Sequence, residues 1–177
     1  ALGEDAPAFK AAFDVNSEGN WEGKTILRRR APRPALSPEI EEGRRRLFDL
    51  RAERSRPHRD EKILGTWNGY MIEALATASC VLEEPRYHAA ARQAARFIRE
   101  HLWEGGRMQR YYLDGLPGIA AYADDYAFLG RGELALYEAS LDLDHLEEAR
   151  RNAGELIRLF RHEDGVFFMT GRDRDGR

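Results

Sequence analysis

The chain has 177 residues, enough for one domain with a hydrophobic core, and its 42% hydrophobic and 33% charged residues predict a soluble globular protein. The formal net charge of −3 argues against a dedicated nucleic-acid-binding protein. No apolar run approaches the ~20 residues of a membrane span, and the start of the chain lacks the basic and then apolar pattern of a signal peptide.

The first part of the chain is rich in loops. A short helix is predicted over residues 5–13, and a short strand over 25–28. Ser37, followed by proline and acidic residues, is typical of a helix start, and this helix is predicted over 37–55. Because it is mostly charged, we expect it on the outside of the molecule. Residues 1–55 are therefore interpreted as a loop-rich portion with one outer helix.

Four further helices are predicted, and they alternate between mostly apolar and amphipathic: 66–82, 86–103, 124–140 and 145–160. Short links join each apolar helix to the amphipathic helix that follows, whereas long connections lead into the apolar helices. Strands are predicted over 107–113 and over 166–170. The helix at 66–82 is apolar all round, so we expect it to be buried on all sides.

This alternation is typical of concentric helical hairpins, in which apolar helices form an inner ring and amphipathic helices wrap around it. The sequence therefore predicts an all-α fold, a partial (α/α) toroid with short strand-like insertions in its long loops. We interpret residues 1–177 as a single domain, part of an (α/α)6-type barrel, with two inner and outer helix pairs over 56–177. A helical-repeat scaffold is the alternative, but the distance between the two inner-helix starts fits none of the common repeats of ~34 or ~40–47 residues.

Successive inner helices should run parallel, which places their N-termini and all the long loops at one end. The positive poles of the helix dipoles meet there, so we expect a binding cleft at this end. Polar residues surround both inner-helix starts: His58, Arg59, Asp60, Lys62 and Asn68 at the first, and Asp124 and Asp125 at the second.

Four residues are candidates for proton transfer. Asp124 or Asp125 could supply a general acid or base, since glycoside chemistry uses paired carboxylates. Adjacent helical residues point about 100° apart, so Asp60 is the better partner for one of them. His58 could transfer protons at neutral pH, as an epimerase requires. The alternative is that Asp124 is an N-cap, Asp125 is a first-turn acid favoured by the helix dipole, and His58 is a solvated loop residue.

Six residues are candidates for substrate binding: Arg59, Lys62, Trp67, Asn68, Arg110 and Tyr126. The three basic side chains could hold a carboxylate, a phosphate or a sugar hydroxyl, and surface ion pairing is their alternative role. Asn68 could hydrogen-bond a substrate or cap its own helix. The two aromatic rings suit the apolar face of a sugar, although Trp67 could equally belong to the core.

Three stretches of the sequence resemble one known family. Residues 56–69 read R-P-H-R-D-E-K-I-L-G-T-W-N-G. They resemble the R-P-H-x-D-D-K-x-L-T-S-W-N-G motif of the spermatogenesis-associated, thioredoxin-domain-containing (YyaL-like) family. Residues 18–27 and 123–129 match two further stretches of that family in the same order. The agreement covers most of the chain.

The resemblance implies a thioredoxin-like domain followed by an (α/α) toroid that is similar to N-acylglucosamine 2-epimerases and six-hairpin glycosidases. This chain has no Cys-x-x-Cys motif, because Cys80 is its only cysteine, so no redox role carries over to it. Glu61, Gly65 and Thr66 depart from the commonest motif letters but leave the ionisable core of the motif intact. The resemblance therefore implies a carbohydrate-processing fold more strongly than any particular reaction.

We expect a protein that binds or processes a carbohydrate, of the sugar epimerase or isomerase type or the glycoside hydrolase type. No cofactor, metal, nucleic-acid or membrane partner is expected, and the single cysteine favours a cytoplasmic setting. Both ends look cut, so we expect a piece of a longer protein whose apolar flanks need further segments or self-association. The alternative function is a non-catalytic helical module for self-association or partner binding.

Overall fold

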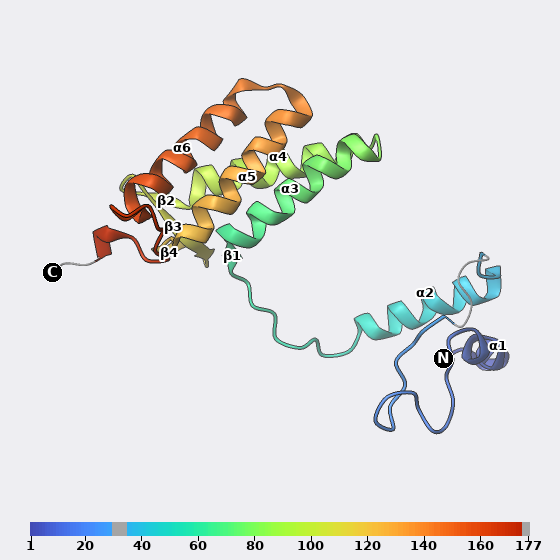
Figure 1. Ribbon diagram of the computed structural model, residues 1–177. Coiled ribbons are helices and arrows are strands. Elements are labelled where there is room, and N and C mark those ends of the chain that lie inside the picture. The colour runs from blue at the N-terminus through green and yellow to red at the C-terminus, as the bar shows by residue number, and fades with distance from the viewer. Residues whose placement is uncertain (30–34, 175–177) are drawn as a thin grey trace. The chain divides into compact units, whose positions relative to one another are not determined.

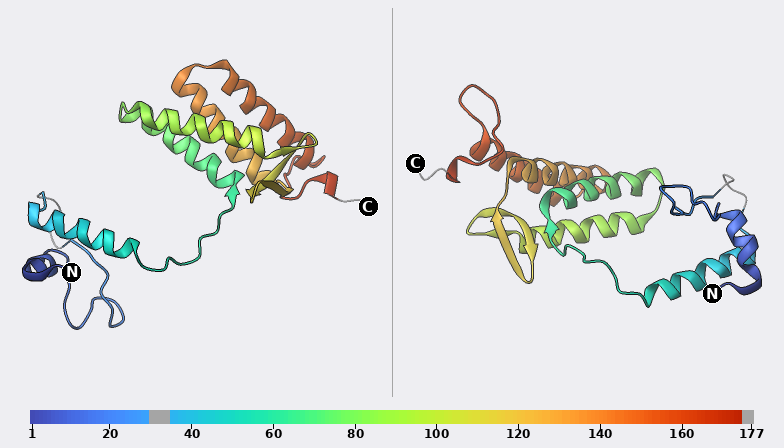
Figure 2. Two further views of the ribbon diagram at one scale, coloured as in Figure 1. Left: turned by 180° about the vertical axis from the view of Figure 1, so that it is seen from behind. Right: turned by 90° about the horizontal axis from the view of Figure 1, so that it is seen from below.

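The computed structural model describes residues 1–29 and 35–174 (Figure 1; further views in Figure 2). Contacts between residues divide the chain into two compact units, Ala1–Arg59 and Asp60–Arg177. No helix in the described part of the chain is both long and apolar enough to cross a membrane.

The first unit contains a 3₁₀ helix η1 (Gly3–Asp5) and two α-helices, α1 (Ala6–Ala12) and α2 (Pro38–Ala52). Both helices predicted in this region are confirmed. Phe9 and Phe13 are buried and their ring centroids lie 4.6 Å apart, which makes them the centre of a small core.

The strand predicted over 25–28 is wrong, because this segment pairs with no strand among residues 1–29 and 35–174. The side-chain amide of Asn20 donates to the carbonyl of Ile26 and accepts from its N–H group, both at 2.8 Å. These two bonds occupy the backbone groups that a neighbouring strand would have used.

The second unit is built on four α-helices: α3 (Gly65–Val81), α4 (Pro85–His101), α5 (Ala123–Ser140) and α6 (Leu143–Phe160). They form two helical hairpins, α3 with α4 and α5 with α6, and α3 packs extensively on α5 (Figure 1). The four predicted helices are therefore confirmed. A last 3₁₀ helix, η2 (Arg172–Arg174), follows near the end of the described chain.

A small antiparallel sheet completes the second unit, so the fold is mainly helical and the all-α prediction is corrected. Its strands are β1 (Ile63–Leu64), β2 (Trp103–Glu104), β3 (Arg107–Leu113) and β4 (Leu116–Ala120), and all three others pair with β3. The predicted strand at 107–113 is confirmed. The turn between β3 and β4 holds Asp114 and Gly115 at positive φ, as two-residue hairpin turns require.

The strand predicted over 166–170 is wrong. This segment is exposed, and its β pairing within the described residues is an isolated bridge between Arg161 and Phe167. The apolar run Val166 to Met169 looks like a buried strand in sequence, but within residues 60–174 no further strand pairs with it.

The core of the second unit lies between α3, α5 and the helices that flank them. Its fully buried members include Ile72 and Ala76 on α3 and Leu129 and Leu136 on α5. The two helices approach closely at Gly69. A Cβ atom placed there would lie 2.6 Å from the backbone carbon of Phe128 and 2.7 Å from the nitrogen of Leu129. Glycine is therefore needed at this crossing.

The helix α3 is not buried on all sides, contrary to the prediction. One face of the helix is mostly apolar and is exposed except at the half-buried Ala78. It is called the α3 stripe below and consists of Trp67, Tyr70, Met71, Ala74, Thr77, Ala78, Val81. The helices α4 and α5 cover the other faces of α3. Most of the stripe is exposed, although the ring of Tyr70 packs against that of Phe128 on α5 at a centroid distance of 3.8 Å. The apolar composition of α3 suits a helix that packs on both sides, and in residues 60–174 only the side facing α4 and α5 is packed.

Replacing Gly69 with alanine is expected to lower the free energy of unfolding by about 1–3 kcal/mol, because the added methyl group meets the backbone of α5. The matched control is Gly154→Ala on α6, where a Cβ meets nothing within 4 Å. That change should raise stability by about 0.5–1 kcal/mol through helix propensity. Urea unfolding of both variants measures the difference. Equal stability of the two variants would contradict the close crossing.

Candidate functional site

One buried carboxylate joins the starts of α3 and α5. Asp125, in the first turn of α5, is 0% exposed and accepts a hydrogen bond from the backbone N–H of Thr66 at 3.1 Å. The hydroxyl of Thr66 donates to the same oxygen, and the N–H of Tyr122 donates to the other oxygen at 2.9 Å. The N-termini of α3 and α5 therefore lie at one end of the unit, as the sequence predicts.

Arg110 brings a positive charge from β3 to this end. Its Nη1 atom lies 3.0 Å from Oδ2 of Asp125 and 3.4 Å from Oδ1 of Asp124. The guanidinium also lies over the ring of Tyr122, 4.7 Å from the ring centroid. One arginine thus contacts both predicted carboxylates, and it fixes β3 against the start of α5.

The two neighbouring carboxylates have different environments. Burial raises the pKa of Asp125, while hydrogen bonds from Thr66 and Tyr122 and the charge of Arg110 lower it. The side chain of Asp124 is 26% exposed and that of Arg110 is 27% exposed, so solvent reaches both. Asp125 is placed to hold the helices, whereas Asp124 is the carboxylate that a bound molecule can contact.

Asp124 is not the N-cap of α5, which corrects the alternative reading of this residue. Tyr122 is the N-cap, and Asp125 closes the first turn by accepting from the Tyr122 N–H group. Oδ1 of Asp124 accepts from the N–H of Asp125 at 3.0 Å. Asp125 occupies the first turn of α5, as the alternative reading expected for an acid favoured by the helix dipole. It also contacts Thr66 of α3, and the sequence pattern of one helix cannot predict a contact with another helix.

Trp67 and Asn68 lie in the first turn of α3. The indole of Trp67 is 71% exposed, directly after the Thr66 that contacts Asp125, so it is a surface residue and not part of the core. The amide of Asn68 donates to the carbonyl of Leu64 at 2.9 Å, which ties the helix start to β1.

Lys62 and Asp60 form an exposed ion pair of 3.1 Å just before β1. Lys62 also lines a hollow of about 450 Å³ between the start of α3 and α4, together with Asn68 and Phe97. The hollow thus collects two of the predicted binding residues. Asp60 pairs with Lys62, and its role as the partner of Asp124 stays a prediction.

Tyr126 was expected to stack on a sugar, but the structure buries its ring completely. Its hydroxyl accepts hydrogen bonds from the N–H of Met108 at 3.1 Å and from Arg107 at 2.6 Å. The ring is a core element that fixes β3 to α5. His58 and Arg59 belong to the first unit and have exposed side chains, and their roles stay predictions.

Sequence reasoning missed a second buried polar cluster. Glu133 on α5 is fully buried, 2.7 Å from Nδ1 of His145 on α6 and 3.6 Å from Nε of Arg99 on α4. Burial raises the pKa of Glu133, and the contacts with His145 and Arg99 lower it. The signal was present, because Glu133 continues the buried stripe of Tyr126 and Leu129 at helical spacing. The cluster joins α4, α5 and α6 to one another.

No group of three or more histidine, cysteine, aspartate and glutamate side chains in residues 1–29 and 35–174 is arranged to hold a metal ion. Where α3 and α5 begin, the available chemical groups are an accessible carboxylate (Asp124), a guanidinium (Arg110) and an exposed indole (Trp67). Such a set can accept and donate hydrogen bonds to hydroxyl groups and can cover one apolar face of a ring.

No protein-family model matches the chain. It is similar to spermatogenesis-associated protein 20 of Homo sapiens, with 34% identity over 141 residues, which are 74% of this chain and 18% of that protein. The same protein of Rattus norvegicus is 34% identical over 145 residues, 75% of this chain and 18% of that protein. An uncharacterized protein of Caenorhabditis elegans is 33% identical over 148 residues, 79% of this chain and 20% of that protein.

The chain therefore spans about a fifth of the length of the curated relatives it matches. These homologues support the spermatogenesis-associated family that the motif at 56–69 indicates.

Asp125→Ala is expected to lower the free energy of unfolding by about 3 kcal/mol, because it leaves the N–H groups of Thr66 and Tyr122 and part of Arg110 without their partner. The matched control is Asp124→Ala, one residue earlier, which removes a partly exposed carboxylate and should cost less than 1 kcal/mol. Urea unfolding at neutral pH compares the two. Similar losses for both would contradict the division of roles.

Proposed function

We propose, from this homology with spermatogenesis-associated protein 20, that the chain is part of an (α/α)-toroid protein that binds or processes a carbohydrate. The binding surface is the end of the second unit where α3 and α5 begin. The observation that carries the proposal is the accessible Asp124 carboxylate held beside Arg110, next to two helix starts of which one exposes Trp67. The reaction class is that of sugar epimerases and isomerases or of glycoside hydrolases.

The helix arrangement supports the toroid part of the proposal. Two hairpins pair a mostly apolar helix with an amphipathic one, and α3 and α5 start at the same end. In a toroid, the next inner helix would cover the α3 stripe that is exposed here. The rest of the parent protein, about four fifths of the length of the matched relatives, would supply it.

The chemistry of the proposed site follows from three side chains. Asp124 accepts hydrogen bonds from sugar hydroxyls and exchanges a proton with the substrate, while Arg110 donates to a hydroxyl or carboxylate. Trp67 stacks on the apolar face of the ring. Glycoside chemistry needs a second carboxylate opposite the first, and epimerase chemistry needs a second proton carrier. Asp60, which belongs to the same unit, is the proposed source of the second carboxylate.

A thermal-shift screen of the chain with mono- and disaccharides tests the proposal. A sugar present at about 100 times its Kd adds about 2.7 kcal/mol to the unfolding free energy, which raises Tm by about 5–10 °C. We expect Asp124→Ala and Trp67→Ala to remove most of this shift while circular dichroism stays unchanged, because both side chains are partly or largely exposed.

The control for this screen is Leu143→Ala, an exposed apolar residue at the start of α6, which lies at the opposite end of the hairpin. It should keep the full shift. Unchanged shifts in both site variants would place the sugar elsewhere. A panel in which no sugar stabilises the chain or the intact parent protein would overturn the carbohydrate proposal.

The α3 stripe supports a second candidate function, self-association of the chain. Its members recur at heptad-like spacing, and small residues at its centre, Ala74 and Ala78, leave a hollow of about 570 Å³ between Tyr70 and Val81. Small residues at the centre of a helix face allow a second helix to approach closely. The occupant proposed here is the same stripe of a second copy, since an isologous contact matches identical apolar patches.

If the stripe joins two copies, Ala74→Glu should abolish the dimer, because it places a charge at the centre of the apolar contact. Sedimentation velocity over a range of protein concentrations measures the change. The matched control is Ala153→Glu, on an exposed position of α6, which should leave the dimer intact. A chain that is monomeric at all concentrations would reject self-association through this surface.

A further inference from the structure

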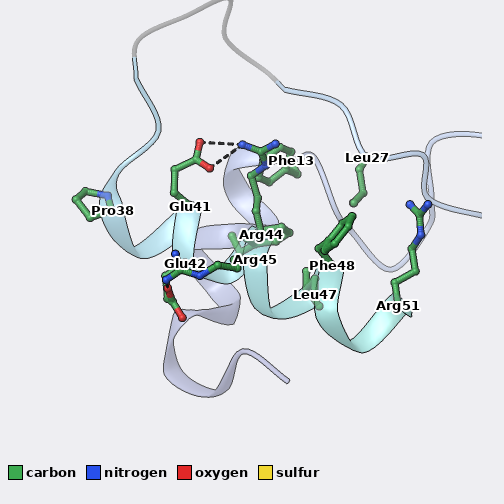
Figure 3. Close-up of a pocket in the computed structure, with 11 residues that line it drawn as sticks. Phe13, Leu27, Pro38, Glu41, Glu42, Arg44, Arg45, Leu47, Phe48 and Arg51 are labelled. Carbon is green, nitrogen blue, oxygen red and sulfur yellow. Dashed lines mark hydrogen bonds and ion pairs between the residues drawn. The ribbon is translucent and has the colours of Figure 1, made fainter. Parts of the chain in front are cut away.

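An apolar groove lies in the first unit between α1, α2 and the loop that carries Leu27. Its volume is about 640 Å³, and Figure 3 shows the side chains that line it. The aromatic and aliphatic part of the lining is Phe9, Phe13, Leu27, Leu47 and Phe48. The volume lies within the ~300–1,000 Å³ that small-molecule sites usually occupy. The carbohydrate proposal makes no use of this groove.

Large apolar side chains at the mouth of the groove are exposed. Phe48 is 66% exposed and Leu27 is 57% exposed, and both face the same space in Figure 3. The helix that carries Phe48 is otherwise rich in charge, so this residue interrupts a polar surface. Contiguous exposed apolar side chains rimmed by charges mark a binding surface more often than scattered ones do.

The charges at the rim do not balance. Arg44 is held by both carboxylate oxygens of Glu41, at 2.9 and 2.7 Å, and Arg45 is paired with Glu42. Arg51 lines the same groove, and among the described residues its guanidinium has no ion pair. Glu41 and Glu42 are thus each neutralised by a neighbouring arginine, and the positive charge of Arg51 remains beside the apolar lining.

We propose that this groove binds an amphipathic carboxylate with a single unbranched hydrocarbon chain. The chain would lie on Phe13, Leu27 and Phe48, and the carboxylate would accept hydrogen bonds from Arg51. A guanidinium suits this partner because it presents two parallel N–H donors to the two oxygens of a carboxylate. A cationic amphiphile does not fit, since Glu41 and Glu42 already have arginine partners.

Isothermal titration of the full chain with sodium octanoate and sodium decanoate tests the hydrocarbon part, at concentrations below micelle formation. Each buried methylene should strengthen binding about fourfold, so decanoate should bind about 15 times more tightly than octanoate. Decyltrimethylammonium, with the same chain and the opposite charge, should bind at least tenfold more weakly than decanoate. Equal affinity for the two carboxylates, or preference for the cation, would overturn the proposal.

Two pairs of variants test the residues. Arg51→Gln should weaken decanoate binding about tenfold, whereas Arg54→Gln, an exposed arginine that does not line the groove, should leave it unchanged. Phe48→Ala should also weaken binding about tenfold, and Leu50→Ala on the same helix should not. All four side chains are exposed, so the fold is expected to survive each change.

The other occupant of such a groove is a second copy of the chain. Sedimentation velocity of the wild-type chain and of Phe48→Ala, with and without decanoate, distinguishes the two. A dimer that dissociates in Phe48→Ala, together with no heat of decanoate binding, would show that a second copy covers the groove and would overturn the proposal. A monomer that binds decanoate supports it.

Discussion

The second unit depends on the buried negative charge of Asp125. A carboxylate that is fully removed from water needs compensation from every direction, and here the compensation comes from three separate elements. The start of α3 contributes the N–H and hydroxyl of Thr66, the start of α5 contributes the N–H of Tyr122, and β3 contributes Arg110. Moving any of these elements would leave an uncompensated charge in the interior. The position of the accessible groups around it follows from this single requirement.

Asp124 owes its location to the same contact. Neighbouring residues on a helix point about 100° apart, so a fixed and buried Asp125 forces Asp124 toward the edge of the unit, where it is partly exposed beside Arg110. The arginine is shared, and its contact with the buried carboxylate is the shorter of the two, 3.0 Å against 3.4 Å. An accessible carboxylate whose neighbours are held by buried contacts is preorganised for binding, which a flexible surface acid would not be. This is the physical basis on which the proposed site is preferred over other exposed acids of the chain.

The sequence predicts the helices of this unit and the end at which α3 and α5 start, because apolar periodicity and link length report directly on local structure and on the direction of each helix. It predicts β3 for the same reason. It fails where the outcome depends on a partner. The exposed segment at 166–170 has the residues of a strand, but in the described part of the chain no strand lies beside it. The segment at 25–28 is held by the side chain of Asn20.

The positions of the candidate site residues were likewise predicted well from local pattern and poorly where burial depends on packing between elements. Asp124 and Asp125 were identified at one helix start and Arg110 as a separate binding candidate, and the structure brings the three into contact. Tyr126 was placed at the surface although its spacing with Leu129 is that of the buried stripe, and Glu133 was overlooked on that same stripe. For Asp124, Asp125 and Arg110, the residue type pointed to a shared site. For Tyr126 and Glu133, the residue type suggested the surface and concealed that both side chains are buried.

The α3 stripe shows the opposite mismatch. Its apolar composition predicts burial, and that prediction holds only in a molecule in which another helix packs against the stripe. The toroid and the self-association proposals need this same surface, so a stripe covered within the parent protein leaves none for a second copy.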